Sequence, residues 1–263
     1  MQHTIRHLTA ILFVLIACSC AGRPTKSGTE LYQAAIKKYD KKKYYDAKQL
    51  FQEAVPLLKR KVEIIDTQFY IAKCLFYDKE YRKSAYCLSD FCKNYPNIPQ
   101  TEEALYLQGY ALYLDSPAVQ LDNTQTEEAI TVLKRYKQQY PTGMYQAEVG
   151  QYIRTLQAQL AEKAFRNAKQ YHHLGHYQAA VISLHNFQQT YLDTAYDAEA
   201  AYLKFESQAK LADAASEADL AAQWHKALTY YYELVEQYPN SQYIPMAQKT
   251  HAHILTKVNY TGE

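Results

Sequence analysis

The sequence has few residues that break helices or form tight turns. Among its 263 residues there are only 7 Gly and 8 Pro. Folds made of many short strands need Gly and Pro at their frequent turns. This scarcity therefore disfavours a strand-rich fold and favours long helices.

The sequence also lacks an excess of charge of either sign. It has 29 Lys and Arg against 27 Asp and Glu, which gives a formal net charge of +2 at neutral pH. The basic residues are scattered among acidic ones and form no stripe of the kind that follows a phosphate backbone. Binding to nucleic acid is therefore not expected.

Motifs for catalysis and for cofactors are missing as well. The chain has no G-x-S-x-G elbow, no phosphate-binding P-loop and no H-E-x-x-H zinc motif. Its carboxylates are spread along the expected helices, as solvated helix faces require. We therefore expect a protein that is not an enzyme and that needs no cofactor.

Possible metal ligands are equally sparse. The 5 Cys include no CxxC pair and no group with zinc-ligand spacing. Cys74, Cys87 and Cys92 fall in expected helices as small buried side chains, although in an oxidising compartment two of them could pair. The segment His172 to His176 has three imidazoles, but it lies at a turn stopped by Gly175, with no Asp, Glu or Cys nearby. No metal site is therefore expected.

The N-terminus has the pattern of a processed leader. The apolar run Ala10 to Ala17 is too short to span a bilayer, so residues 1–17 are predicted to be a signal peptide. Leu15-Ile16-Ala17-Cys18 resembles the bacterial lipobox, in which the Cys is acylated and becomes the mature N-terminus. By the sorting rule attached to this motif, Ser19 favours the outer membrane. The alternative is a soluble secreted protein cleaved nearby.

An internal repeat of 37 residues follows this leader. Tyr32, Phe69 and Tyr106 are separated by 37 residues each. The second helix of each unit carries a large residue, a small one three positions later and a large one four further on. Five copies begin at Tyr44, Tyr81, Thr126, Tyr177 and Trp224. Small residues let paired helices approach closely, and stacked pairs then share a core. The sequence thus predicts an all-α solenoid of tetratricopeptide-like helical hairpins, with about five repeats.

Residues that end helices between the repeats indicate how the chain is organised. Helices are expected to stop at Tyr95-Pro96, Tyr140-Pro141 and Tyr238-Pro239, whereas the fourth stop has Tyr191-Leu192 instead. Next come polar residues expected to cap the following helices: Asn97, Thr142, Asp193 and Asn240. Residues 145–173 are predicted to form one long helix. The expected divisions are a lipidated flexible tether at 18–28, repeats 1–3 at 29–144 and repeats 4–5 at 145–257.

Taken together, the lipobox, the five hairpins, the Tyr-Pro stops and a lengthened third loop at 115–123 resemble the BamD family of outer-membrane β-barrel assembly lipoproteins. The resemblance covers the chain from Cys18 to about residue 255. It implies a lipid-anchored protein on the periplasmic face of the outer membrane. It also implies that the C-terminal repeats dock on the periplasmic domains of a BamA-like insertase and that the N-terminal repeats receive unfolded outer-membrane proteins.

One stripe of the first helices is a candidate binding surface. Its residues recur at positions i, i+4 and i+7, which lie on one helix face. In tetratricopeptide folds this stripe lines the inner, concave surface, and Tyr and Phe offer apolar area with little rotamer entropy to lose. The predicted peptide-binding groove consists of Tyr32, Tyr39, Phe69, Lys73, Phe76, Tyr106, Tyr110 and Tyr113. The alternative is that these side chains pack internally between repeats.

Two other functions remain possible from the sequence. One is a periplasmic repeat lipoprotein that coordinates cell-wall synthesis or envelope constriction. The other is an enzyme carried on a repeat scaffold. The repeat count and the lengthened third loop favour barrel assembly over the role in cell-wall synthesis or envelope constriction.

Overall fold

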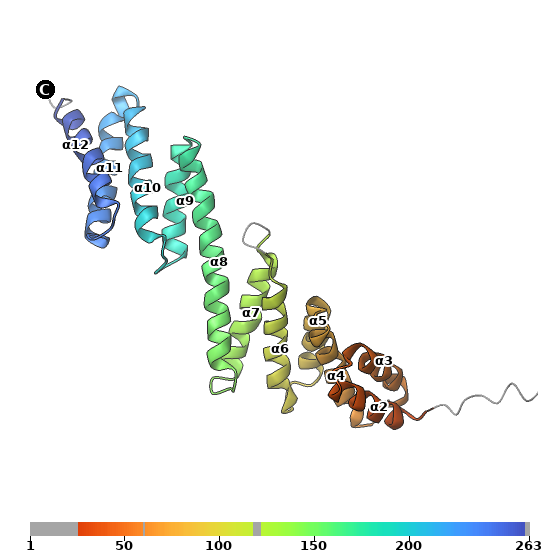
Figure 1. Cartoon of the computed structure of the whole chain (residues 1–263). Coiled ribbons are helices and arrows are strands. Elements are labelled where there is room, and N and C mark those ends of the chain that lie inside the picture. The colour runs from red at the N-terminus through yellow and green to blue at the C-terminus, as the bar shows by residue number, and fades with distance from the viewer. Residues whose placement is uncertain (1–25, 60, 118–121, 261–263) are drawn as a thin grey trace, which may run out of the picture. The chain divides into compact units, whose positions relative to one another are not determined.

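The computed structural model describes residues 26–59, 61–117 and 122–260, and the predicted all-α repeat fold is confirmed there. Within these ranges the chain forms eleven α-helices, one short 3-10 helix and no strand (Figure 1). The predicted signal peptide and the acylated Cys18 lie outside the described residues.

The chain separates into two compact units, one up to Ala111 and one from Leu112 on. The first contains α2 (Gly28–Asp40), α3 (Tyr44–Ala54), η2 (Val55–Leu57), α4 (Glu63–Tyr77) and α5 (Tyr81–Asn94). Helix α6 (Gln100–Asp115) runs across the boundary. The second contains α7 (Thr124–Gln139), α8 (Gln146–His173), α9 (Tyr177–Thr190), α10 (Asp197–Asp213), α11 (Glu217–Gln237) and α12 (Ile244–Tyr260). The sequence-based grouping into repeats 29–144 and 145–257 stays a prediction.

The helices follow the predicted hairpin order. The second helices α3, α5 and α9 begin at the predicted Tyr44, Tyr81 and Tyr177, and α7 begins two residues before Thr126. The fifth, α11, begins at Glu217, seven residues before Trp224, and so has two extra turns. The predicted long helix is confirmed as α8, which packs against α7, α9 and α10. Helix α12 follows the last hairpin and packs against α10 and α11.

A small residue is fully buried in the second helix of every hairpin. The predicted small positions of the second helices are all 0% exposed: Ala47, Ser84, Ala129, Ala180 and Ala227. The large residues four positions on are also buried: Phe51, Leu88, Leu133, Leu184 and Tyr231. Where the small residue is polar it is satisfied, because the Ser84 hydroxyl donates to the Ala72 carbonyl at 2.9 Å. In the second unit this packing places Trp224, 2% exposed, in the core.

Three hairpins turn through the same backbone motif. Lys42, Lys79 and Gly175 have φ of 57°, 63° and 76°, and each stands two residues before the Tyr that starts the second helix. The following N–H groups close six-residue Schellman loops, as in the 2.9 Å bond from Glu80 N to Leu75 O. Gly175 thus confirms the predicted helix stop. The two lysines adopt a conformation that costs an L-residue about 1–2 kcal/mol.

The helix caps predicted from the sequence are wrong. Helices α6, α8, α10 and α12 begin three or four residues after Asn97, Thr142, Asp193 and Asn240. The Tyr-Pro stop is followed by a turn that uses these polar residues, as in the bonds from Gly143 N to Tyr140 O and from Ser241 N to Tyr238 O. The cap of α2 follows the usual pattern, since Ser27 and Glu30 form a reciprocal capping box.

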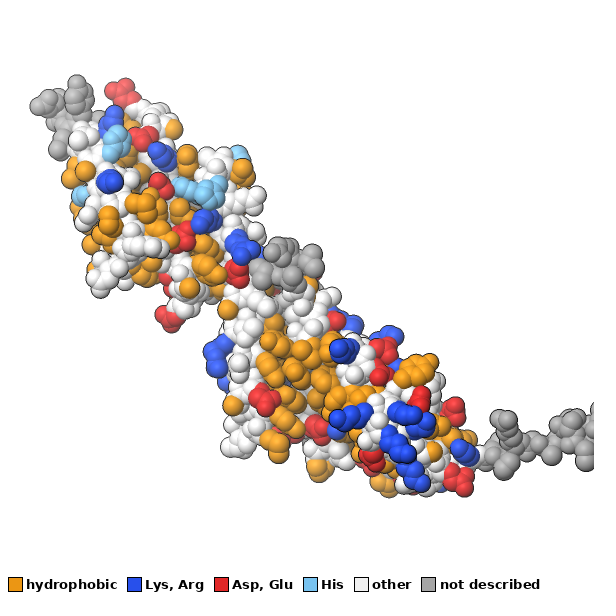
Figure 2. All heavy atoms as spheres, in the orientation of Figure 1, with side chains coloured by type: hydrophobic (Ala, Val, Ile, Leu, Met, Phe, Trp, Pro, Cys, Tyr) orange, Lys and Arg blue, Asp and Glu red, His pale blue; other side chains and the backbone are white. Residues whose placement is uncertain are grey.

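The surfaces of the two units carry side chains of mixed character. In Figure 2, basic and acidic side chains are interspersed with apolar ones on the visible faces of both units. None of the described helices is long and apolar enough to cross a membrane. Cys74, Cys87 and Cys92 form no disulfide within the described ranges, and burial raises the pKa of Cys74 to about 12.

Replacing Lys79 by Gly tests the turn motif. Glycine adopts a positive φ without the side-chain penalty, although it gains entropy in the unfolded chain. We expect Lys79→Gly to stabilise the first unit by about 0.5–1 kcal/mol, measured by hydrogen exchange of α4 and α5. The matched control is Gln52→Gly in the interior of α3, which should destabilise by about 0.5–1 kcal/mol. Faster exchange in Lys79→Gly would contradict the strain argument.

Candidate peptide-binding surface

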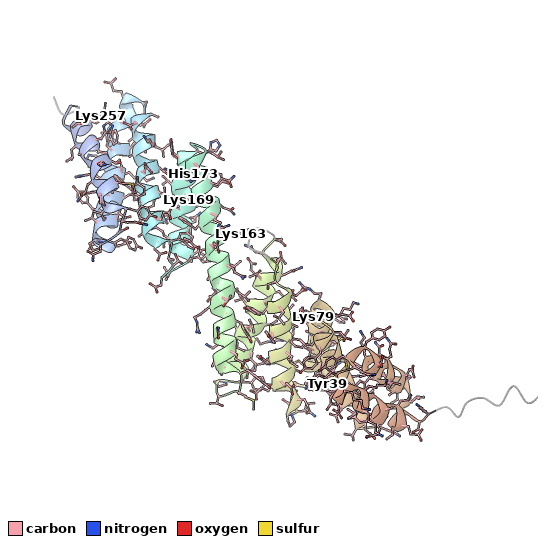
Figure 3. The ribbon with its side chains drawn as sticks, in the orientation of Figure 1. Tyr39, Lys79, Lys163, Lys169, His173 and Lys257 are labelled. Atoms are coloured by element: carbon pink, nitrogen blue, oxygen red, sulfur yellow. The ribbon has the colours of Figure 1, made fainter. Side chains whose placement is uncertain are left out.

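Seven of the eight predicted groove residues lie in the first unit, where five of them take part in one chain of ring contacts. Successive ring centroids lie 4.9–6.1 Å apart along a series of eight residues: Tyr32, Phe51, Tyr70, Tyr39, Tyr77, Phe76, Tyr110 and Tyr106. We call these eight residues the aromatic ladder. Tyr39, on α2, is labelled in Figure 3. The ladder links α2, α3, α4 and the part of α6 in this unit.

The predicted residues differ in how much of each side chain reaches the surface. Phe69 and Tyr106 are buried, 5% and 8% exposed, and the Phe69 ring stacks on Phe91 at 5.1 Å. Tyr32, Tyr39 and the rest of the predicted set are partly exposed: Lys73, Phe76, Tyr110 and Tyr113. The buried pair serves packing within the unit. The partly exposed side chains are the ones that a guest chain can reach.

Burial also changes the chemistry of the ladder phenols. The pKa of Tyr39 is raised well above its ordinary value, first by burial and then by the neighbouring Tyr77. Burial likewise raises the pKa of Tyr32, with Asp66 adding to the effect. These hydroxyls therefore stay neutral at physiological pH, and the ladder presents rings without charge.

Lys73 has two roles in the same place. Its ammonium lies 2.7 Å from Glu103 Oε1 and 5.1 Å from the centre of the Phe69 ring. The ion pair ties α4 to α6 within the first unit. Lys73 therefore supports packing between α4 and α6, where its positive charge is paired with Glu103.

Tyr113 belongs to the second unit. Its ring stacks on Tyr152 of α8, with centroids 4.5 Å apart. It therefore contributes to packing there, and its place in the predicted groove stays a prediction.

Three ladder residues were missed from the sequence: Phe51, Tyr70 and Tyr77. Tyr70 stacks on Phe51 at 5.4 Å and lies 4.9 Å from Tyr39, so it joins the first two repeats. Tyr77 is 44% exposed and offers the ladder its most open ring. The signal was present, because Tyr70 and Tyr77 are seven residues apart on α4 and share one face.

A partly buried ion pair joins the first two hairpins. Lys48 is 7% exposed, and its ammonium lies 2.5 Å from Glu80 Oε1 and 3.9 Å from Asp78 Oδ2. Hydrogen bonds from Lys48 and then Lys83 lower the pKa of Glu80 to about 2. The pair joins α3 to the turn before α5.

The histidine segment is held by its neighbours in the second unit. His172 Nδ1 lies 2.9 Å from Ser207 Oγ, and Nε2 lies 3.3 Å from Glu206 Oε2. The bond to His172 is the main cause that lowers the pKa of Glu206. Ser207 is 0% exposed, so its hydroxyl is closed to a substrate. These residues tie α8 to α10.

Two clefts open beside the loop between α9 and α10. The larger, of 1210 Å³, is lined by α7, α8 and this loop. The smaller, of 470 Å³, is lined by α9, α10 and α11. Tyr191, Leu192 and Asp193 border both, and Leu192 is 75% exposed. No sequence pattern indicated these clefts, apart from Leu192 at a position where Pro was expected.

Comparisons with known proteins agree with this architecture. The model of a family described as an outer membrane lipoprotein, YfiO, matches residues 24–223. A tetratricopeptide-repeat model matches residues 206–241, which cover part of α10 and all of α11. A protein of Aquifex aeolicus (strain VF5), named as a candidate outer membrane protein assembly factor BamD, is 30% identical over 136 residues. That match covers 49% of this chain and 44% of the relative, less than half of its length.

Removing the Glu80 carboxylate tests the buried ion pair. Glu80→Gln removes the negative charge closest to the buried Lys48 ammonium, so we expect faster hydrogen exchange in α3 and α5 at pH 7, equivalent to about 1–2 kcal/mol. Because the folded pKa of about 2 is below the ordinary 4.5, the pair stabilises the fold above about pH 4.5 and loses this effect towards pH 2. The difference between variant and wild type should therefore shrink at about pH 3.

The control is Asp90→Asn, which removes an exposed ion pair with Lys93 on the same helix α5. It should change exchange by less than about 0.5 kcal/mol. Equal effects of the two substitutions at pH 7 would show that Lys48 does not depend on Glu80.

Proposed function

Because the chain belongs to the YfiO family of outer membrane lipoproteins, we propose that it is a non-enzymatic scaffold of the machinery that assembles outer-membrane β-barrel proteins. The observation that carries this proposal is the family match over residues 24–223 of a chain built from tetratricopeptide hairpins. The relative in Aquifex aeolicus, named for outer-membrane protein assembly, supports the same role. Acyl chains on Cys18 hold the protein on the periplasmic face of the outer membrane.

The two groups of repeats have separate partners in this proposal. The C-terminal repeats dock on the periplasmic domains of a BamA-like insertase. The N-terminal repeats receive unfolded outer-membrane proteins before insertion. A scaffold of this kind needs one fixed contact and one reversible contact, and a helical solenoid offers a separate surface for each.

The aromatic ladder supports the reversible contact. Its partly exposed rings, Tyr39, Tyr77 and Tyr110 among them, form a rigid apolar surface that loses little entropy on binding. Barrel strands alternate apolar and polar residues, so every second side chain of an extended segment can contact such a surface. Each aromatic contact contributes about 0.5–1.5 kcal/mol beyond burial of area, which suits a transient complex.

Peptide binding tests the ladder. We expect Tyr110→Ala to weaken binding of a synthetic peptide of a barrel's C-terminal strand by about 5–30-fold, which corresponds to about 1–2 kcal/mol. The matched control is Tyr86→Ala on α5, which removes a 69% exposed tyrosine outside the ladder and should leave affinity unchanged. Fluorescence anisotropy of a labelled peptide measures both. Unchanged affinity of a folded Tyr110→Ala protein would remove the ladder from the proposal.

Depletion and co-purification test the assembly role itself. Depleting the protein in cells should lower all outer-membrane barrel proteins together, because they share one insertion route. Purification from detergent-solubilised membranes should recover a BamA-like insertase in near-equal amount. Recovery of a peptidoglycan synthase with normal barrel levels would contradict the proposal and favour a role in cell-wall synthesis.

A further inference from the structure

The smaller cleft of the second unit has the features of a binding site that is separate from the aromatic ladder. It has a volume of 470 Å³ and lies among α9, α10 and α11, which Figure 1 shows side by side. Three tyrosines contribute to its walls: Tyr191, Tyr230 and Tyr238. The fold therefore provides a recess with aromatic walls, large enough for one long side chain.

Charge in this cleft is not balanced. Of its carboxylates, Glu233 is paired with the buried Lys204, whose ammonium lies 3.1 Å away and 4.4 Å from the centre of the Tyr230 ring. Asp197 accepts the backbone N–H of Thr194 at 3.0 Å, a neutral donor. Asp193 makes no hydrogen bond or ion pair with any residue in the described ranges. Two negative charges therefore remain without a cation.

One acceptor in the wall of the cleft has no hydrogen-bond donor. The side-chain oxygen of Gln188, a wall residue, is buried and has no partner among the described residues. A buried acceptor without a donor costs about 1–3 kcal/mol. The pKa of the wall residue Tyr238 is raised, first by burial and then by the negative charges of Asp197 and Asp193. The missing groups are thus a positive charge and N–H donors.

The rim adds an apolar contact. Asp193 has a φ of 57°, and this turn leaves Leu192, 75% exposed, between the two clefts. An apolar side chain held in solvent at the edge of a charged recess is typical of a protein contact.

We propose that this cleft receives an arginine side chain of a protein partner, with an apolar neighbour of that arginine contacting Leu192. A planar guanidinium stacks on tyrosine rings and donates up to five N–H bonds, which suits the Gln188 oxygen and the Asp193 carboxylate together. A lysine ammonium is a compact point charge and meets these demands less well. The inference rests on the proposed docking of a partner on the C-terminal repeats, and it names the chemistry of that contact.

Two matched peptides test the inference. Ac-Leu-Arg-Leu-amide carries the guanidinium, and Ac-Leu-citrulline-Leu-amide has the same shape without the charge. Each is titrated into the full-length chain labelled with ¹⁵N-glutamine, and the side-chain NMR signals of Gln188 and Gln237 are followed. We expect the arginine peptide to shift both signals and to bind at least about five-fold more tightly than the citrulline peptide.

A substitution in the cleft and a matched substitution outside it test the same inference. Asp193→Asn removes the charge, while asparagine keeps the positive φ that the turn requires. It should weaken the arginine peptide by about three- to five-fold and leave the citrulline peptide unchanged. The control Glu217→Gln removes an exposed carboxylate on α11 outside the cleft and should change neither. Equal affinity of both peptides, or no effect of Asp193→Asn, would overturn the inference.

Failure of this inference can be told apart from failure of the proposed function. If the peptides do not shift Gln188 but the insertase co-purifies and barrel levels fall on depletion, only the arginine site is wrong. If the peptides bind as expected but depletion leaves barrel levels unchanged, the cleft stands and the assembly role falls.

Discussion

The structure depends on one small, fully buried side chain in the second helix of each hairpin. Ala47, Ser84, Ala129, Ala180 and Ala227 are fully buried at equivalent positions. A methyl or hydroxymethyl group there lets two backbones come together, so large residues on either side can close the core. Where the residue is Ser84, its hydroxyl bonds to the facing helix. Every surface described above is placed by this repeated contact.

Aromatic side chains provide a second set of contacts between the helices of the first unit. In the first unit the ladder joins successive helices through ring contacts, so the same side chains both pack and present a surface. Helical periodicity predicted which residues share a helix face. Periodicity could not say how deeply a neighbouring helix covers that face. For this reason Phe69 and Tyr106, expected in a groove, are buried instead.

Local signals in the sequence were reliable where one residue decides the backbone. Gly175 stops a helix as predicted, and Tyr44, Tyr81 and Tyr177 start helices as predicted. The cap predictions failed because these residues lie within or beside the turn that follows each helix stop, three or four residues before the next helix begins. The positive φ of Lys42 and Lys79 could not be predicted from the sequence, because lysine itself does not favour that conformation. The clefts beside Leu192 were beyond sequence reasoning, because α7, α8, α9, α10 and α11 all contribute to their walls.

Trp224 gives the molecule an internal optical probe. It is the single tryptophan of the chain and lies in the core of the second unit, while the first unit has only tyrosine and phenylalanine. Tryptophan fluorescence, excited at wavelengths that tyrosine does not absorb, therefore comes from the second unit alone. The far-ultraviolet circular dichroism of the helices comes from both units. A difference between these two signals during denaturation separates the loss of the ladder-bearing unit from the loss of the cleft-bearing unit.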